Sequence, residues 1–222
     1  MPTPEQIRHQ MEKLTADLVG LSLCDRQNFP SLRDLGEGCR EVGIGERGNV
    51  SYALKNIPYH DIYAELERTQ TYNLRMLDGA LIHMIYRFRD NQVEAHRLAF
   101  FPSPFLEEFQ NNPEIYIEDE VYAEVIMKNI VPFPLRFDFD CREEVVVEVD
   151  HPKSHLTLGQ YQNCRIPVSA PVTPYHFIGF ILRNFYNTAY CKYCGQITAF
   201  THAFDTSIAD REMNLLYVQI PD

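Results

Sequence analysis

One stretch of the sequence restricts the fold more than any other: two strand-like runs, residues 80–88 and 93–101, joined by Asp90 and Asn91. Within the first run, two sets of side chains alternate, as the two faces of a β-strand require. One set is Ala80, Ile82, Met84, Tyr86 and Phe88, and the other is Leu81, His83, Ile85 and Arg87. Aspartate and asparagine are typical turn residues. The pattern predicts an antiparallel hairpin with a loop of about four or five residues.

The first residues carry the signature of a helix that begins at Thr3. Thr3 is a capping residue, Pro4 takes the first helical position, and Gln6 completes a capping box. Apolar residues then recur at helical spacing and form one stripe: Ile7, Met11, Leu14, Leu18 and Leu21. We expect a helix over residues 3–21 whose stripe packs against the core, with a groove for a partner helix as the minor alternative.

The rest of the chain mixes helices and strands without a repeat. Five glycines between residues 36 and 48 predict an irregular loop over residues 24–50, and they do not match a phosphate-binding motif. Helices are expected over residues 59–70 and 114–128 and from Thr173 onward. Strands are expected over residues 135–141, 145–149, 155–158, 165–168 and 215–220.

These elements predict the fold class. Strands and helices do not alternate regularly, which favours an α+β fold with a mainly antiparallel, mixed sheet flanked by helices over a doubly wound parallel sheet. A chain of 222 residues without a long linker suits one domain. We expect a single domain over residues 1–222, in which helix 3–21 and loop 24–50 are an appendage to a core of residues 51–222.

Charge and cysteine content restrict the partners and the location. The net charge is −11, which argues against broad, non-specific binding of nucleic acid, because phosphate backbones are bound by clustered Lys and Arg. Acidity favours solubility first, and contact with a basic protein partner is its other use. Neither a secretory leader nor an apolar run long enough to span a bilayer is found. We expect a cytoplasmic protein without a membrane partner, whose six cysteines stay reduced.

The strand at residues 135–141 contains the most informative polar pattern. Its Arg136, Asp138 and Asp140 share one face, roughly 7 Å apart at each two-residue step, while the other face is aromatic and belongs to the core. A solvent-exposed sheet face is the plain explanation. More polar side chains follow, however: His151, Lys153, Ser154, His155 and Arg165.

If these strands are neighbours, the polar residues converge on one site. In that hypothesis the catalytic residues are Asp138, Asp140, His151 and His155, and the substrate-binding residues are Arg136, Lys153, Ser154 and Arg165. Carboxylates and imidazoles can hold a divalent metal that activates water. Alternatively, histidine acts as acid or base while arginine stabilises an oxyanion or phosphate. The residues alone leave the metal and any other cofactor open.

Cys191 and Cys194 form a CxxC pair. A zinc ribbon needs a second pair of ligands, and here His176 or His202 would have to complete the site. A redox role needs the strand-to-helix context of thioredoxin, which the pattern does not predict. A structural role is therefore favoured. The motifs of serine hydrolases, zincins, calcium loops and kinases are absent from the sequence.

Several longer strings carry a resemblance: Met76–Leu81, His96–Pro102, Pro134–Asp140, His151–Gly159 and Cys164–Val168. Together they resemble a bacterial family known as domain of unknown function 2290, from about residue 72 to residue 186 and beyond. The resemblance implies no agreed activity. The Arg-Phe-Asp strand followed by histidines is also similar, more loosely, to small bacterial toxin families thought to cleave RNA, although their denser run of histidines is missing.

Two hypotheses follow for the function. The leading one is a bacterial cytoplasmic protein of a defence or toxin–antitoxin system, with a nuclease-like site that takes RNA or a nucleotide. The alternative is a non-catalytic subunit that binds a protein partner through its acidic surface. In that case the same polar residues form a structural network.

Overall fold

The fold is built around a nine-stranded sheet, seen in a computed structural model that describes residues 1–45, 57–105, 133–161 and 163–221. The strands are β1 (Cys24–Gln27), β2 (Ser31–Gly36), β3 (Cys39–Gly43), β4 (Leu74–Met76), β5 (Leu81–Arg89), β6 (Gln92–Phe101), β7 (Leu135–Asp140), β8 (Ser154–Leu158) and β9 (Ile166–Pro167). They are ordered β1-β4-β5-β6-β7-β8-β9, and β3 joins β2 to the far end of β5. Each pair of neighbouring strands is antiparallel.

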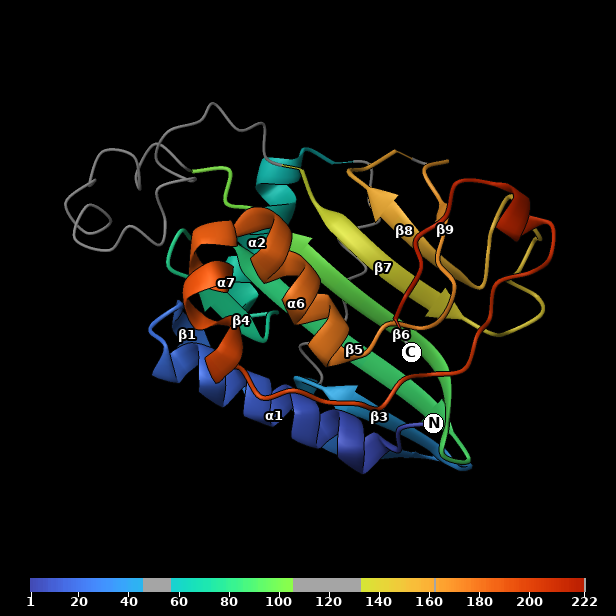
Figure 1. Ribbon diagram of the computed structural model, residues 1–222, viewed down its shortest axis with the longest axis horizontal. Helices are drawn as coiled ribbons and strands as arrows, with labels where there is room; N and C mark the ends of the chain where they lie inside the picture. Colours follow the sequence, from blue (N-terminus) through green and yellow to red (C-terminus); the bar gives the residue numbers. More distant parts are fainter. Residues whose placement is uncertain (46–56, 106–132, 162, 222) are drawn as a thin grey trace.

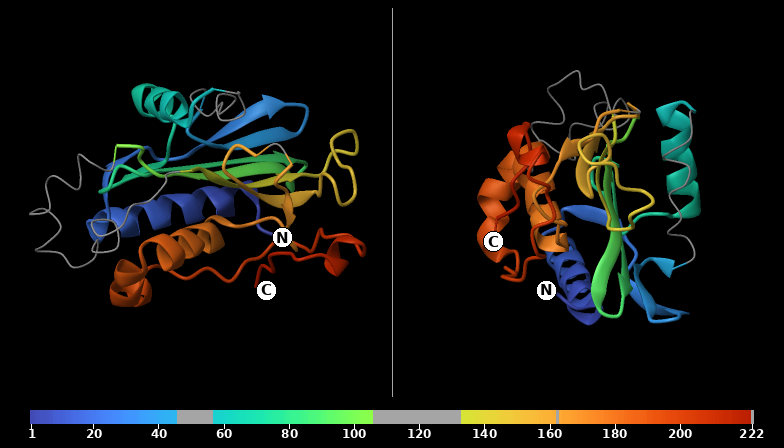
Figure 2. Two further views of the ribbon diagram at one scale, coloured as in Figure 1. Left: turned by 90° about the horizontal axis from the view of Figure 1, so that it is seen from above. Right: turned by 90° about the vertical axis from the view of Figure 1, so that its right-hand side faces the viewer.

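Helices cover both faces of this sheet (Figure 1). They are α1 (Pro4–Gly20), α2 (Tyr59–Thr69), α6 (Pro174–Phe185) and α7 (Asn187–Tyr193), followed by the short 3-10 helices η4 (Cys194–Gln196) and η5 (Glu212–Asn214). Figure 2 shows α1, α6 and α7 on one face and α2 alone on the other. The expected α+β class with a mainly antiparallel sheet is confirmed. None of the described helices is long and apolar enough to span a bilayer.

The hairpin expected from residues 80–101 is present as β5 and β6, with a tighter loop than predicted. Arg89 pairs with Gln92, so the loop holds two residues, Asp90 and Asn91. Their φ angles are 49° and 69°. Two successive left-handed residues match the right-handed twist of the strands, which is why the shorter loop suffices.

The N-terminal helix is confirmed in its detail. Thr3 Oγ1 accepts the amide of Gln6, and Gln6 Oε1 accepts the amide of Thr3, which completes the capping box. Four residues of the predicted stripe are fully buried (Ile7, Met11, Leu14 and Leu18), and Leu21 is partly buried against them. The stripe joins the large core, to which α6 and the near face of the sheet also contribute.

The expected loop over residues 24–50 is wrong, because residues 24–43 form β1, β2 and β3. Gly36 and Gly38 adopt positive φ and close the turn between β2 and β3. A Cβ on Gly38 would meet the Asp90 carboxylate at 2.4 Å, so the glycine lets two turns approach closely. Since β3 pairs with β5 and β1 with β4, this segment is part of the sheet and not an appendage.

Two further strand predictions are wrong. Residues 145–149 form turns around one bridge between Val147 and His151. Residues 215–220 contribute a single parallel bridge, Val218 to Val168. The helix expected at 114–128 lies outside the described residues. Helix α7 was not predicted, whereas α2, α6, β7, β8 and β9 lie where the sequence pattern placed them.

The face of the sheet beneath α2 divides into an apolar end and a polar end. At the apolar end, α2 packs on a second core cluster: Ile62, Tyr63, Leu66, Tyr72, Leu81, Ala99 and Phe101. Two residues further along each central strand, the face becomes polar. Ala99 of β6 is opposite Arg136 of β7. Arg97, the next residue of β6 on the same face, is opposite Asp138 of β7. The strand register therefore brings charged side chains together beside an apolar floor.

Candidate functional site

Four polar side chains meet on the polar end of this face: Arg97, Arg136, Asp138 and His155, here called the Arg-Asp-His cluster. Cross-strand pairing explains the meeting, because Asp138 on β7 is directly opposite Arg97 on β6 and His155 on β8. Arg136 lies one two-residue step along β7 on the same face. The predicted alternation along β7 is therefore present, and its polar face is largely covered rather than open to water.

Asp138 is the carboxylate around which the cluster gathers. Arg97 Nε donates to its Oδ1 at 2.7 Å. Arg136 Nη2 and His155 Nε2 lie 3.8 Å and 3.9 Å from its Oδ2. Burial raises the pKa of Asp138, but the charges of Arg97 and Arg136 outweigh burial and leave this pKa below its usual value. The carboxyl group is therefore ionised at neutral pH.

The positive charge of Arg136 is the least compensated charge in the cluster. Only 9% of the residue is exposed. Among the described residues, its buried Nη1 finds no hydrogen-bond acceptor. Burial lowers the pKa of Arg136; Asp138 opposes that shift, while the positive charges of Arg97 and Arg165 add to it. In the described part of the chain, two guanidiniums thus share the Asp138 carboxylate, and the charge of a third, on Arg165, adds to the repulsion at Arg136. An excess of positive charge favours an additional anion.

His155 is held in one tautomer. Its Nδ1 lies 2.9 Å from the carbonyl oxygen of Pro152, and because a carbonyl can only accept, Nδ1 carries the proton. Nε2 then holds the lone pair and faces the cluster. Burial lowers the pKa of His155 despite the nearby Asp138, so the ring is neutral at pH 7 with a basic nitrogen available.

His151 and Asp140 lie beside the cluster rather than in it. The rings of His151 and His155 are 5.1 Å apart between centroids. Asp140 accepts two hydrogen bonds from the Arg142 guanidinium, at 2.9 Å and 2.5 Å. Burial raises the pKa of Asp140, but the bonds from Arg142 reverse the shift and leave this pKa lowered, with a small contribution from His151. This carboxylate therefore already has its own partner.

Two of the predicted substrate-binding residues are not brought to the cluster. Ser154 precedes His155 on β8, so its side chain points to the opposite face, where Oγ donates to the carbonyl of Ala170 at 3.0 Å. The Lys153 side chain is exposed, with no hydrogen bond or ion pair to the cluster among the described residues. Arg165, just before β9, is half-buried, and its charge acts on Arg136 and His155.

The metal hypotheses gain no geometric support. Over the described ranges, no group of three or more His, Cys, Asp or Glu side chains is placed to hold a metal ion. Cys191 lies on α7 and Cys194 begins η4. Both are exposed, and all six cysteines are free thiols. The cluster contains the groups that the acid–base alternative requires, a histidine with a basic nitrogen and arginines beside it.

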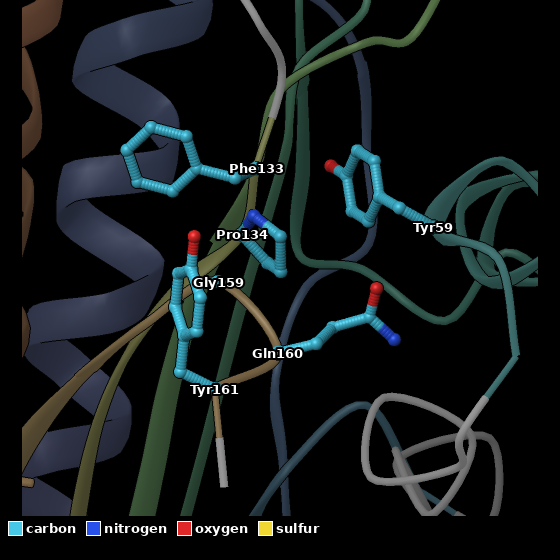
Figure 3. A pocket seen from close by; sticks show the side chains of 6 residues that line it. All are labelled: Tyr59, Phe133, Pro134, Gly159, Gln160 and Tyr161. Carbon is cyan, nitrogen blue, oxygen red and sulfur yellow. The ribbon is translucent and has the colours of Figure 1, made fainter. Parts of the chain in front are cut away.

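Sequence reasoning missed a pocket at the end of the same face (Figure 3). It has a volume of about 310 Å³ and is lined by Tyr59, Phe133, Pro134, Gly159, Gln160 and Tyr161. Pro134 and Gly159 lie just beyond the paired ends of β7 and β8. No sequence pattern connects Tyr59 to residues a hundred positions away, so only the folded chain reveals the pocket.

Comparison with known proteins gives a family but no activity. The family model described as "Uncharacterized conserved protein (DUF2290)" matches residues 23–220. No curated protein and no solved structure matches the chain.

Proposed function

We propose that this chain, which belongs to the DUF2290 family of uncharacterised conserved proteins, binds a phosphate-containing ligand at the Arg-Asp-His cluster and cleaves it as a nuclease-like enzyme. Nothing in the family description assigns an activity, so the proposal rests on the chemistry of the cluster. Its ligands would be RNA or nucleotides, bound at one local site of an acidic protein.

The observation that supports phosphate binding is the unbalanced guanidinium of Arg136. A buried cation is costly unless it is paired and hydrogen-bonded. The carboxylate available to Arg136 is Asp138, whose Oδ1 already accepts the shorter bond from Arg97. Phosphate oxygens match the planar donor fork of arginine. A bound phosphate would supply the missing acceptor for Arg136 and offset the repulsion among the arginines.

Acid–base cleavage would use the two imidazoles. His155 Nε2 would take the proton from the attacking hydroxyl or water as the new P–O bond forms. Asp138, 3.9 Å from Nε2, would stabilise the resulting imidazolium. His151 would protonate the leaving oxygen as the old P–O bond breaks, and Arg136 and Arg97 would stabilise the charge on the phosphate. The step needs no redox partner.

The alternative is a structural polar network in a non-catalytic protein-binding subunit, and one observation favours it. His155 is only 5% exposed and Arg136 only 9%, which is more burial than open active sites usually show. In this alternative the cluster stabilises the fold, and phosphate has no specific effect on the protein.

His155→Asn separates the two. The asparagine amide can take over the Nδ1 bond to the Pro152 carbonyl, but it has no basic nitrogen at the Nε2 position. RNA, single-stranded DNA and nucleotides are offered to the wild type and the variant, with Mg²⁺ and with a chelator. We expect cleavage to fall by about 100-fold or more in the variant while inorganic phosphate still binds. The exposed His202 provides the control variant His202→Asn, which should cleave normally.

Each outcome has a clear meaning. Full cleavage by His155→Asn contradicts the catalytic role of His155. Unfolding of the variant, together with no binding of phosphate by the wild type, supports the structural network instead.

A further inference from the structure

The pocket beside α2, where β7 begins and β8 ends, has aromatic walls. Figure 3 shows the Tyr59 ring on one side and the rings of Phe133 and Tyr161 on the other, with Pro134 between them. Its volume of about 310 Å³ is at the small end of the range for small-molecule sites. Aromatic walls around a space of this size suit one planar ring system rather than a whole cofactor.

The backbone holds these walls in place. Gly159 has a φ of 61°, which glycine adopts without strain and which turns the chain back after β8. Its amide donates to the carbonyl of Pro134 at 2.6 Å. A Cβ at Gly159 would lie 3.4 Å from the Tyr161 ring, so the turn seats that ring against the backbone. Across the pocket, Tyr59 Oη donates to the carbonyl of Pro102 at 2.6 Å.

Two of the aromatic rings are unusually open to solvent. Tyr161 is 76% exposed and Phe133 is 48% exposed. Large apolar side chains this exposed and gathered at one pocket mark a binding surface more often than a structural one. A nucleobase can stack on such rings whatever its identity, because every base has a π-face.

The pocket lies near the Arg-Asp-His cluster along two paired strands. Pro134 is two residues before Arg136 in the chain, and Gly159 is two residues after Thr157, which is paired with Arg136. One two-residue step spans roughly 7 Å. That separation is comparable to the one between a nucleobase and the phosphate of the same nucleotide.

We propose that this aromatic pocket receives the nucleobase of a ligand whose phosphate lies at Arg136, which makes nucleotides the ligand class of the site. The inference rests on the proposed phosphate binding and extends it, because it predicts that the base adds affinity. Tyr161 and Phe133 would stack on the base from one side, and Tyr59 would close the other. Recognition by stacking alone would accept purines and pyrimidines.

Isothermal titration with three probes tests this: inorganic phosphate, ribose 5-phosphate and adenosine monophosphate. We expect the nucleotide to bind roughly ten- to a hundred-fold more tightly than ribose 5-phosphate to the wild type. Tyr161→Ala should bring those two affinities to within about three-fold of each other by loss of the stacking contact, and should leave the affinity for inorganic phosphate unchanged. The exposed Phe29 lies before β2, outside the pocket, and Phe29→Ala is the matched control that should keep the preference.

The probes separate the two proposals. If the wild type binds phosphate and ribose 5-phosphate but gains nothing from the base, or if Tyr161→Ala keeps the full preference for the nucleotide, the pocket assignment is overturned and phosphate binding stands. If none of the three probes binds, the proposed function fails, and the pocket assignment fails with it.

Discussion

Asp138→Asn removes the carboxylate charge that Arg97, Arg136 and His155 share while keeping the shape of the side chain. The asparagine oxygen can still accept the hydrogen bond from Arg97 Nε. The two arginines, however, lose the negative charge that compensates their own charges. We therefore expect two effects of opposite sign: a less stable protein without phosphate, and tighter binding of phosphate.

The size of the stability loss follows from the burial of the group. Removing one partner of a buried ion pair typically destabilises a protein by about 3–5 kcal/mol. Arg97 keeps part of its side chain in water, and the asparagine preserves one hydrogen bond. The lower end, about 3 kcal/mol, is therefore expected.

The gain in phosphate affinity follows from Coulomb's law. A unit charge about 6 Å from a bound phosphate contributes up to ~3 kcal/mol at an effective dielectric constant of about 20. Screening by solvent and salt reduces that figure. We expect Asp138→Asn to bind phosphate at least about ten-fold more tightly than the wild type, which corresponds to about 1.4 kcal/mol.

Urea unfolding at constant ionic strength, with chloride replaced stepwise by phosphate, measures both effects. Phosphate should stabilise the variant more than the wild type, because a ligand of the folded state stabilises it by RT ln(1 + [L]/Kd), which is larger for the protein that binds more tightly. Glu12→Gln, which breaks the solvent-exposed pair with Arg8 on α1, is the control and should change stability by less than about 1 kcal/mol. A variant as stable as the wild type, or an equal phosphate response in both proteins, would refute the reasoning.

Three further predictions concern the fold. Thr3→Ala removes the capping box of α1 and should lower the free energy of unfolding by about 1 kcal/mol, measured by urea unfolding. Tyr186→Phe removes the hydroxyl that donates to the buried Asp78 carboxyl and should cost about 1–3 kcal/mol in the same assay. Burial lowers the pKa of His83 and of His96 to about 3, whereas the pKa in the unfolded chain is about 6.5. Between these two values only the unfolded chain takes up the protons, so the protein is fully stable above pH 6.5 and loses stability as the pH falls toward 3. In that range His96→Gln should reduce the slope of unfolding free energy against pH by up to about 1.4 kcal/mol per pH unit, and an unchanged slope would contradict the burial of a neutral ring.

Local patterns predicted the elements whose partners are near in the sequence. The capping box at Thr3 and Gln6 needs four residues, and it is present. The alternation along β7 correctly assigned Arg136 and Asp138 to one face, because the period of a strand is fixed by its backbone. The family resemblance is also confirmed, by a match that covers residues 23–220.

Glycines misled the prediction for residues 24–50. A cluster of glycines is equally compatible with a loop and with a tight turn between strands. The choice between them depends on whether a neighbouring strand supplies hydrogen bonds. Here β3 pairs with β5. Asp90, in the turn that follows β5, comes so close to Gly38 that any larger side chain at position 38 would clash with it.

The membership of the cluster depends on register, which a single sequence does not contain. Nothing in the sequence around Arg97 connects it with Asp138, and only the pairing of β6 with β7 places the two opposite each other. Ser154 was grouped with His155 because they are adjacent, yet adjacency in a strand puts them on opposite faces. A shift of one residue in the β7–β8 pairing would have exchanged their roles.

The most direct test of phosphate binding at the cluster is a calorimetric titration of inorganic phosphate into the wild type, Arg136→Gln and Arg87→Gln. Arg87 lies on β5 and is paired with Glu41, so its replacement removes one positive charge outside the cluster. We predict that phosphate binds the wild type and Arg87→Gln with similar affinity, and that Arg136→Gln binds at least about ten-fold more weakly, as loss of a charge-assisted hydrogen bond implies. Equal affinities for all three proteins, or no binding to the wild type, would contradict it.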